Sequence, residues 1–399
     1  MQTALISGAG VAGTAAAYWL DRFGWRVTML ERAETLRTTG QNVDVRGAGR
    51  DVIRRMGLDD RIAASGTGEV GTRFVDARGR TVAEFPAGTG DSDGATAERE
   101  ILRAQLVAAL DDVLPDRVEH RFGDAITAVG QHGDRVEVTF QHGRPQSFDI
   151  LVIAEGIRSD TRDLVLPGRV HIRDLGQYIA YGAIPRLDRD DRWWNWLPAG
   201  RGRAVMLRPD NLGTTRASLA FLAPPEGLER LEPDRQIARL REVFADHPGP
   251  ARRILDALAG DHGDFYLDRV AQVRLPSWTS GRIAVVGDAA YCPSPISGMG
   301  TSLALTGGYI LAGELATWRD HRDALRRYEE RMRPYVAKAQ QLPPGAPRLA
   351  NPRTRAGVAL FNTGLRLAAS RPARALGGRL FTPPAESIDL PDYGLIRHG

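Results

Sequence analysis

The sequence predicts an α/β fold: a Rossmann-type domain, a second and mainly β-sheet domain, and C-terminal helices. First, the short apolar segment 3–7 runs into a glycine-rich turn and a helical pattern over 14–23. Second, another apolar segment, 282–286, ends at a Gly-Asp pair two thirds of the way along the chain. Third, residues 170–225 are rich in strand-like sequence, which indicates a second domain inserted into the first.

The glycine-rich turn has the spacing of a dinucleotide-binding site. Gly8 permits a tight turn, and Gly10 lets backbone amides approach a pyrophosphate at the positive end of the helix. Gly13 lets helix and strand pack closely. Glu31 follows a second strand over 27–30 and is placed to accept hydrogen bonds from ribose hydroxyls. These residues predict the adenosine end of a dinucleotide site.

Length and composition exclude several classes of protein. A chain of 399 residues with 42% hydrophobic content can build two domains with sizeable cores. Its net charge is only +4, and its 53 basic residues, of which Lys338 is the single lysine, form no basic run, so we expect no nucleic-acid partner. One cysteine excludes an intramolecular disulfide, and eight histidines without ligand spacing predict no metal site.

The N-terminal region and the hydropathy pattern indicate the cellular compartment in which we expect the protein. The first strand begins three residues from Met1, which leaves no room for a signal peptide. No uninterrupted apolar run reaches the length of a membrane span. We therefore expect a cytoplasmic protein with no membrane span.

Hydrophobic periodicity predicts the remaining elements. A loop is expected over 87–96, and the strands at 125–129 and 135–140 are expected to form a hairpin. We expect helices at 50–56, 99–110, 234–259, 299–340 and 355–369, and strands at 72–75, 125–129, 135–140, 148–154, 178–181, 193–196, 204–207, 217–222, 265–273 and 282–286.

Three stretches, 8–13, 149–162 and the Gly287-Asp288 pair, occur in a familiar order and spacing. Together they resemble the FAD-dependent aromatic hydroxylases, the para-hydroxybenzoate hydroxylase-like single-component flavoprotein monooxygenases. The stretch 37–57 is further similar to tetracycline-inactivating and polyketide-tailoring monooxygenases. The resemblance covers residues 1 to about 340. It implies non-covalent FAD, NADPH or NADH as reductant, O2, and a small aromatic or polyketide-like substrate.

The second motif would serve the flavin ring. Asp288 can accept a charge-assisted hydrogen bond from a ribityl hydroxyl, next to a backbone approach at Gly287. The loop with Pro295, Gly298 and Gly300 leads into a helix beginning near Gly300. The resemblance implies that the positive end of this helix faces the flavin pyrimidine and stabilises negative charge on the reduced ring.

The resemblance also assigns arginine and acidic residues to the cofactors. Arg99 and Arg103 lie one helical turn apart in the expected helix; Arg99 matches the family arginine that contacts FAD. Asp44 matches an acidic residue near the flavin, and Arg37 a position associated with the pyridine nucleotide. Glu155 stands where the family usually has aspartate. The expected cofactor-binding residues are Gly8, Gly10, Gly13, Glu31, Arg32, Arg37, Asp44, Arg99, Arg103, Glu155, Gly156, Gly287, Asp288, Pro295, Gly298 and Gly300.

The resemblance implies a division into three parts. Residues 1–70, 97–169 and 266–340 would form the FAD-binding domain, 71–96 and 170–265 the substrate-binding domain, and 341–399 a C-terminal helical tail. Alternating aromatics on a sheet pack against the core more often than they bind ligands, so half of the candidate substrate residues are expected in the core. The candidates are Tyr178, Tyr181, Trp194, Trp196, Met206 and Phe221.

The function implied is insertion of one oxygen atom into an aromatic or polycyclic molecule, by hydroxylation, epoxidation or Baeyer-Villiger chemistry. Because the flavin performs the reaction, we single out no catalytic side chain. An FAD-dependent dehydrogenase without oxygen insertion is an alternative, as is a non-catalytic dinucleotide-fold protein like the prenyl-protein escort factors. A halogenase is disfavoured, because Trp194-Asn-Trp196-Leu-Pro198 is one residue short of the halogenase signature and Lys338 lies far from the lysine position.

Overall fold

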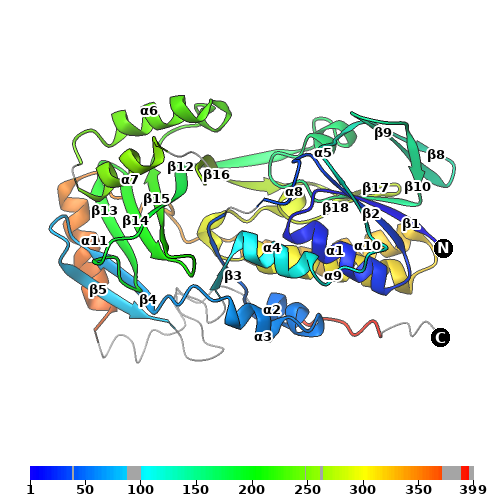
Figure 1. The fold of residues 1–399 in the computed structure, drawn as a ribbon, viewed down its shortest axis with the longest axis horizontal. Coiled ribbons are helices and arrows are strands. Elements are labelled where there is room, and N and C mark those ends of the chain that lie inside the picture. The colour runs from blue at the N-terminus through cyan, green and yellow to red at the C-terminus, as the bar shows by residue number, and fades with distance from the viewer. Residues whose placement is uncertain (38–39, 88–99, 248, 261–263, 371–387, 395–399) are drawn as a thin grey trace.

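The structure is a computed structural model that describes residues 1–37, 40–87, 100–247, 249–260, 264–370 and 388–394. It has two lobes, each built around its own sheet (Figure 1). The helices are α1 (Val11–Arg22), α2 (Gly47–Arg55), α3 (Asp59–Ala64), α4 (Arg103–Asp111), α5 (Asp160–Val165), α6 (Pro233–Val243), α7 (Pro250–Leu258), α8 (Asp288–Tyr291), α9 (Gly300–Thr317), α10 (His321–Ala339) and α11 (Arg355–Ala368), with 3-10 turns η1 (Leu228–Arg230) and η2 (Pro295–Ser297).

A six-stranded sheet forms the first lobe and brings the two ends of the dinucleotide motif together. Its strand order is β17-β18-β11-β1-β2-β7, and all neighbours are parallel except β17 and β18. The strands are β1 (Thr3–Ser7), β2 (Arg26–Glu31), β7 (Glu119–Phe122), β11 (Ile150–Ile153), β17 (Thr279–Ser280) and β18 (Ile283–Val285). Parallel strands end at the same edge of the sheet, so the turns after β1 and β18 lie near each other.

Helices and a small sheet enclose this lobe. The long helix α9 packs against α1, α2 and α10, and α4 packs on α1 (Figure 1). The antiparallel sheet β10-β9-β8 contacts β1 and β11; its strands are β8 (Ile126–His132), β9 (Arg135–Phe140) and β10 (Gln146–Phe148). The expected hairpin is therefore confirmed as β8 and β9.

A seven-stranded sheet forms the second lobe, in the order β16-β12-β15-β14-β13-β4-β5. Helices α6 and α7 cover one of its faces. The strand β16 pairs with β12 in this sheet, so the boundary expected at residue 266 assigns β16 to the wrong sheet. The strands are β4 (Gly71–Val75), β5 (Thr81–Pro86), β12 (His171–Pro185), β13 (Trp194–Gly200), β14 (Arg203–Pro209), β15 (Thr214–Phe221) and β16 (Tyr266–Arg274).

The helix expected over 99–110 begins later, at Arg103. Glu100–Leu102 forms a short strand, β6, which pairs antiparallel with β3 (Asn42–Asp44). Both Ile101 and Leu102 are buried, and Leu102 is extended with ψ of 134°. Tertiary pairing thus overrides the helical pattern of these residues. Arg99 and most of the loop expected over 87–96 lie outside the described residues.

Two other predicted helical stretches are helical in the structure, but each forms two helices rather than one. The stretch 234–259 forms α6 and α7, because Gly249 has a positive φ of 92° and Pro250 begins the second helix. The stretch 299–340 forms α9 and α10, with the Asp320 side chain capping α10. Across the described ranges no helix is both long and apolar enough to span a bilayer.

The C-terminal region contacts both lobes. Helix α11 packs beside β5 and β13, where Phe361 meets Phe74 edge to face. Further along, the Tyr393 hydroxyl donates to Glu314 at 2.7 Å and the Tyr309 hydroxyl donates to the Pro391 carbonyl at 2.7 Å. These two hydrogen bonds therefore attach the segment 388–394 to α9.

Candidate active site

The turn between β1 and α1 has the geometry of a phosphate-binding turn. Gly8 has a φ of +108°, and its amide donates to the Leu30 carbonyl at 2.7 Å. A Cβ on Gly13 would lie 1.9 Å from the Gly8 carbonyl oxygen, so only glycine permits this packing of helix on strand. A Cβ on Gly10 would have open space around it as far as the Arg103 guanidinium, 3.7 Å away. The amide end of α1 can therefore receive a pyrophosphate.

The Glu31 carboxylate lies at the end of β2, beside this turn. Its two oxygens accept the backbone N–H groups of Ala9 and Ala33, each at 3.0 Å. Each oxygen keeps further lone-pair capacity, and the side chain is half-buried. Glu31 is thus oriented by the backbone and able to accept from ribose hydroxyls.

Several arginines gather beside Glu31. Burial lowers the pKa of Arg37, and the nearby positive charges of Arg103, Arg32 and Arg158 lower it further, whereas Glu31 opposes the shift. Arg32 also pairs loosely with Asp160, at 3.9 Å. Arginines close enough to repel one another create a positive potential that suits phosphate groups.

The Gly287-Asp288 turn closes on the first helix. Gly287 has a φ of +67°, and a Cβ there would lie 2.7 Å from the Ala12 Cβ on α1. Asp288 is exposed to the cleft, yet the surrounding protein desolvates its carboxyl and raises the pKa. A Cβ on Gly300 would lie 3.8 Å from the Asp288 carboxylate. The carboxylate therefore lies close to the start of α9.

The loop before α9 brings Asp44 to the same place. It passes through the 3-10 turn that begins at Pro295 and reaches Gly298, whose φ is +64°. A Cβ on Gly298 would lie 3.9 Å from the Asp44 carboxylate. Helix α9 then begins at Gly300 with no side-chain cap, so its first amides remain available to a ligand.

Arg46 is a site residue that the sequence analysis missed. Its side chain is only 2% exposed, and Nη2 lies 2.9 Å from the Asp44 carboxylate. Its backbone N–H donates to the Ser302 hydroxyl at 2.9 Å, and this hydroxyl donates to the Arg46 carbonyl at 3.0 Å. Arg46 thereby joins Asp44 to α9. The Asp-x-Arg spacing in a stretch already expected near the flavin was the available signal.

Glu155 is engaged by the protein itself. Its carboxylate accepts from the hydroxyls of Ser7, Ser159 at 2.7 Å and Thr161 at 2.6 Å, and from the Thr161 N–H at 3.1 Å. The longer side chain, where the family usually has aspartate, thus ties α5 to β1. Gly156 has a φ of +84° with open space around it. Cofactor contact by Glu155 and Gly156 stays a prediction.

Four of the six candidate substrate residues share the side of the seven-stranded sheet opposite α6 and α7, which we call the cleft face because it packs towards the loop before α9. Trp196, Met206 and Tyr181 lie in one transverse row, linked through Ser218 by the strand register. Trp194 lies beside Trp196, with ring centroids 5.3 Å apart. This cluster also packs against Ile296, from the loop before α9. The aromatic row therefore faces the flavin motifs.

Two candidates are corrected by the structure. Tyr178 and Phe221 lie opposite each other on the other face of the sheet, stacked with centroids 5.5 Å apart, and both are buried against α6 and α7. The Tyr178 hydroxyl accepts the backbone N–H groups of Glu226 and Gly227. Side chains alternate across a strand, so residues 178 and 181 point to opposite faces. Tyr178 and Phe221 are core residues.

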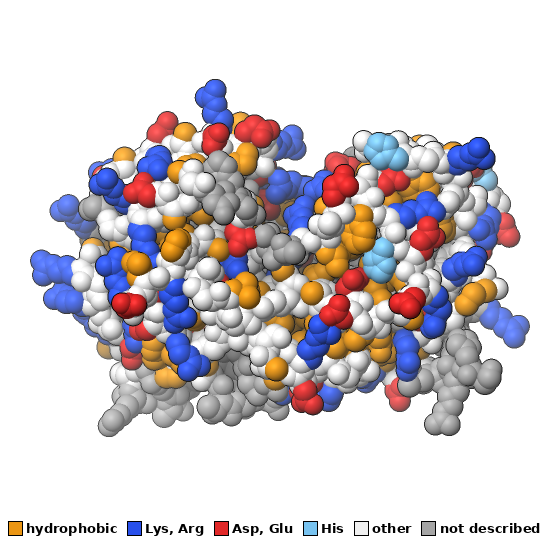
Figure 2. Space-filling view, in the orientation of Figure 1, with side chains coloured by type: hydrophobic (Ala, Val, Ile, Leu, Met, Phe, Trp, Pro, Cys, Tyr) orange, Lys and Arg blue, Asp and Glu red, His pale blue; other side chains and the backbone are white. Residues whose placement is uncertain are grey.

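A cavity of about 390 Å³ lies between the lobes, beside the arginine group. Its walls include Arg158, whose guanidinium lies 3.2 Å from Asp268, and Arg269, which lies 3.4 Å from Asp174. Figure 2 shows the outline notched between the lobes, with basic side chains gathered on the wall of the notch. The arginines lining the cavity are Arg32, Arg158, Arg162, Arg230 and Arg269.

Known proteins are similar to this chain in sequence and in fold. A model of the FAD binding domain matches residues 1–342. A flavin-dependent monooxygenase from an unidentified prokaryote is 38% identical over 339 residues, covering 84% of this chain and 87% of that protein. Crystal structures of the tetracycline destructases Tet(51) and Tet(55) align with TM-scores of 0.81 and 0.80 and identities of 30% and 32%. They cover 99% and 98% of this chain and 99% of each destructase.

Proposed function

The chain belongs to the family of proteins with this FAD binding domain, and on that premise we propose that it oxygenates a planar polycyclic aromatic molecule of the polyketide or tetracycline type. It is an NAD(P)H-dependent flavoprotein monooxygenase, and its cofactor is FAD. The resemblance expected from the sequence is thereby confirmed, and oxygen insertion is favoured over the dehydrogenase and the non-catalytic alternatives.

The aromatic row opposite the flavin motifs carries the proposal about the substrate. Tyr181 stacks on Tyr266 with centroids 4.9 Å apart, and Trp196 stacks on Phe74 at 5.7 Å. Flat aromatic side chains on one sheet face suit a flat polycyclic ligand. Burial raises the pKa of both Tyr181 and Tyr266, so both phenols stay protonated; the Tyr266 hydroxyl donates to Gln41.

When bound, FAD supplies hydride acceptance from NAD(P)H and activation of O2 for transfer of one oxygen atom. The residues described above would orient it: the amides after Gly10 at the pyrophosphate, Glu31 at the ribose, and Asp288 at the ribityl chain. The positive end of α9 would stabilise negative charge on the ring. Tyr181 and Trp196 would exclude water from the reacting edge.

We place the phosphates of the reductant in the arginine-lined cavity. The cavity extends from Arg32, beside Glu31, to Asp268, whose charge influences the pKa of Asp288. Through Arg32 it lies beside the expected adenosine end of the FAD site. Its lining also includes the carboxylates Asp160, Asp163, Glu229 and Asp268, so a phosphate would have to exchange ion pairs such as Arg158–Asp268 to bind an arginine bidentately.

Two measurements test the proposed function. The purified protein should be yellow, and acid denaturation should release all flavin into the supernatant, because the attachment is proposed to be non-covalent. Incubation with NADPH, air and either tetracycline or 1,8-dihydroxyanthraquinone should yield a product heavier by one oxygen atom. NADPH consumption of equal rate with and without oxygen would instead indicate a dehydrogenase, and colourless protein would refute FAD binding.

A further inference from the structure

Arg208, from β14, is held on two sides by buried carboxylates. Its Nε lies 2.8 Å from Glu69 Oε2, and its Nη2 lies 2.6 Å from Glu100 Oε1. The Glu69 and Glu100 side chains are only 1% and 4% exposed. The guanidinium also lies over the Trp194 ring, 4.2 Å from its centroid. Three contacts therefore fix the plane of this guanidinium.

The same guanidinium belongs to the cleft-facing side of the sheet. Arg208 follows Met206 by two residues, so both side chains leave the strand on one face. Its side chain is 17% exposed. Over the described ranges Nε and Nη2 have hydrogen-bond acceptors, whereas Nη1 has none and is not buried. The third nitrogen therefore presents its N–H donors to the cleft.

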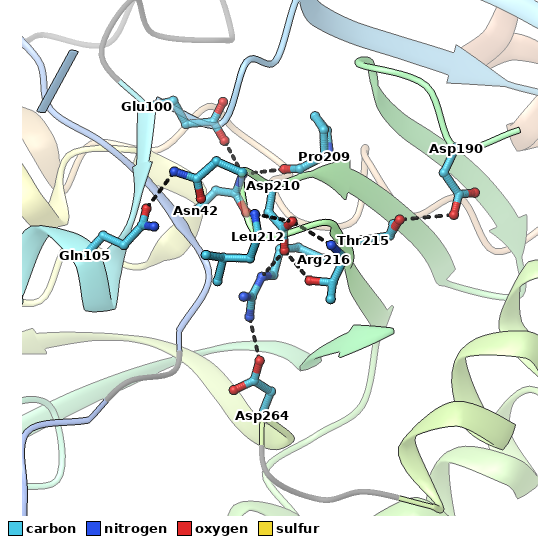
Figure 3. Close-up of polar contacts among 12 residues, drawn as sticks. Asn42, Glu100, Gln105, Asp190, Pro209, Asp210, Leu212, Thr215, Arg216 and Asp264 are labelled. Carbon is cyan, nitrogen blue, oxygen red and sulfur yellow. Dashed lines mark hydrogen bonds and ion pairs between the residues drawn. The ribbon is translucent and has the colours of Figure 1, made fainter. Parts of the chain in front are cut away.

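The charges around Arg208 indicate what those donors would bind. Burial, assisted by Glu69 and Asp44 and opposed by Arg208, raises the pKa of Glu100 to about 8. Glu100 also accepts from Asn42, which in turn donates to the Pro209 carbonyl at 3.2 Å (Figure 3). Arg208 already has Glu69 and Glu100 in contact, and the Asp44 charge also acts on it. A neutral or partly negative oxygen suits this site better than a full anion.

We propose that Arg208 is a specificity-determining residue: its Nη1 donates a hydrogen bond to a carbonyl oxygen of the polycyclic substrate. The inference rests on the proposed function and narrows the substrate to a molecule that has such an oxygen near the aromatic row. Buried clusters of arginine and carboxylate contribute little net stability, so a structural role alone accounts poorly for this one.

Two matched probes test the proposal without turnover. 1,8-Dihydroxyanthraquinone and 1,8-dihydroxyanthracene share their fused rings and hydroxyls but differ in the two carbonyl oxygens. Calorimetric titration without NADPH and without oxygen gives a Kd for each. In Arg208→Met the Kd of the quinone should rise about tenfold or more, and that of the anthracene by less than about twofold. Arg252→Met, 80% exposed on α7, should change neither.

A second variant covers the case in which Arg208→Met does not fold. Arg208→Lys keeps the positive charge between Glu69 and Glu100 but lacks the third nitrogen, so it should show the same selective weakening for the quinone. Equal weakening of both probes, or a wild-type protein that does not prefer the quinone, would overturn the proposal. A wild type that prefers the quinone but never oxygenates it would refute only the proposed function.

Discussion

The two faces of the seven-stranded sheet carry similar side chains in opposite settings. On one face Tyr178 and Phe221 stack under α6 and α7 and are 0% and 3% exposed. On the other face Tyr181 and Trp196 are half-buried and look towards the flavin motifs. Residue type does not distinguish the two pairs. The two pairs differ in what covers them: α6 and α7 cover Tyr178 and Phe221, and no helix of the described residues covers Tyr181 and Trp196 in the same way.

The uncovered face also carries the charged groups. Arg208 is 17% exposed on this face, and the buried carboxylates of Glu69 and Glu100 hold its guanidinium. The covered face is filled mainly by aliphatic side chains such as Leu240 and Ile254. A sheet with one sealed face and one polar aromatic face can be both a core and a binding surface.

The largest difference between the faces is expected in stability. Phe221→Ala removes a buried ring from the sealed face and should lower the free energy of unfolding by about 3–5 kcal/mol. Urea unfolding of the FAD-loaded protein measures it. Trp196→Ala, on the cleft face, should cost clearly less. Equal losses would mean that both faces are core.

The cleft face should instead control coupling. Tyr181→Ala should leave FAD affinity unchanged but misplace the substrate, and a shift of about 1 Å can cost roughly 100-fold in rate. Oxygen and NADPH would still be consumed, with hydrogen peroxide replacing the oxygenated product. Comparing peroxide with product per NADPH tests this. A fully coupled Tyr181→Ala, or one that loses FAD, would contradict the assignment of this face.

Asp288 tests the opposite wall of the cleft. Asp288→Ala removes a charge-assisted hydrogen bond to the ribityl chain and should weaken FAD by about 1.5–3 kcal/mol, or roughly 10- to 150-fold. Because Asp288 is open to the cleft, the apoprotein should remain folded. Flavin fluorescence during titration of the apoprotein gives the Kd. An unchanged FAD affinity would mean that Asp288 does not bind the ribityl chain and only ends the strand.

The last test concerns the pH dependence of stability at Glu100. Its folded pKa of about 8 lies above the ordinary value of 4.5, so its contribution is complete below pH 4.5 and is lost as pH rises through 8. The slope between these values can reach about 1.4 kcal/mol per pH unit. Glu100→Gln should flatten this part of the curve, measured as the unfolding midpoint against pH. An unchanged curve would show that Glu100 is ionised throughout.

Much of the geometry at the expected flavin site was predictable because it is local in sequence. The turn at Gly8 and Gly13, the acid at Glu31, and the loop into α9 each follow from residues within one strand-turn-helix unit. Such units are specified by backbone geometry that only certain residues allow, above all glycine at positive φ. The role of these units in binding FAD was inferred from the resemblance to the FAD-dependent aromatic hydroxylases.

By itself, therefore, the sequence determined the α/β class, the two ends of the dinucleotide motif and the aromatic content of the second sheet. Only the tertiary structure decided that Glu100–Leu102 is a strand, that Tyr178 faces away from the cleft, and that Arg208 lies between Glu69 and Glu100. The period of two along a strand shows that Tyr178 and Tyr181 take opposite faces, but not which face is covered. The covered face is the one on which α6 and α7 pack. These helices are formed by residues 233–258, which are distant in sequence, so the pattern within the strands cannot reveal which face they cover.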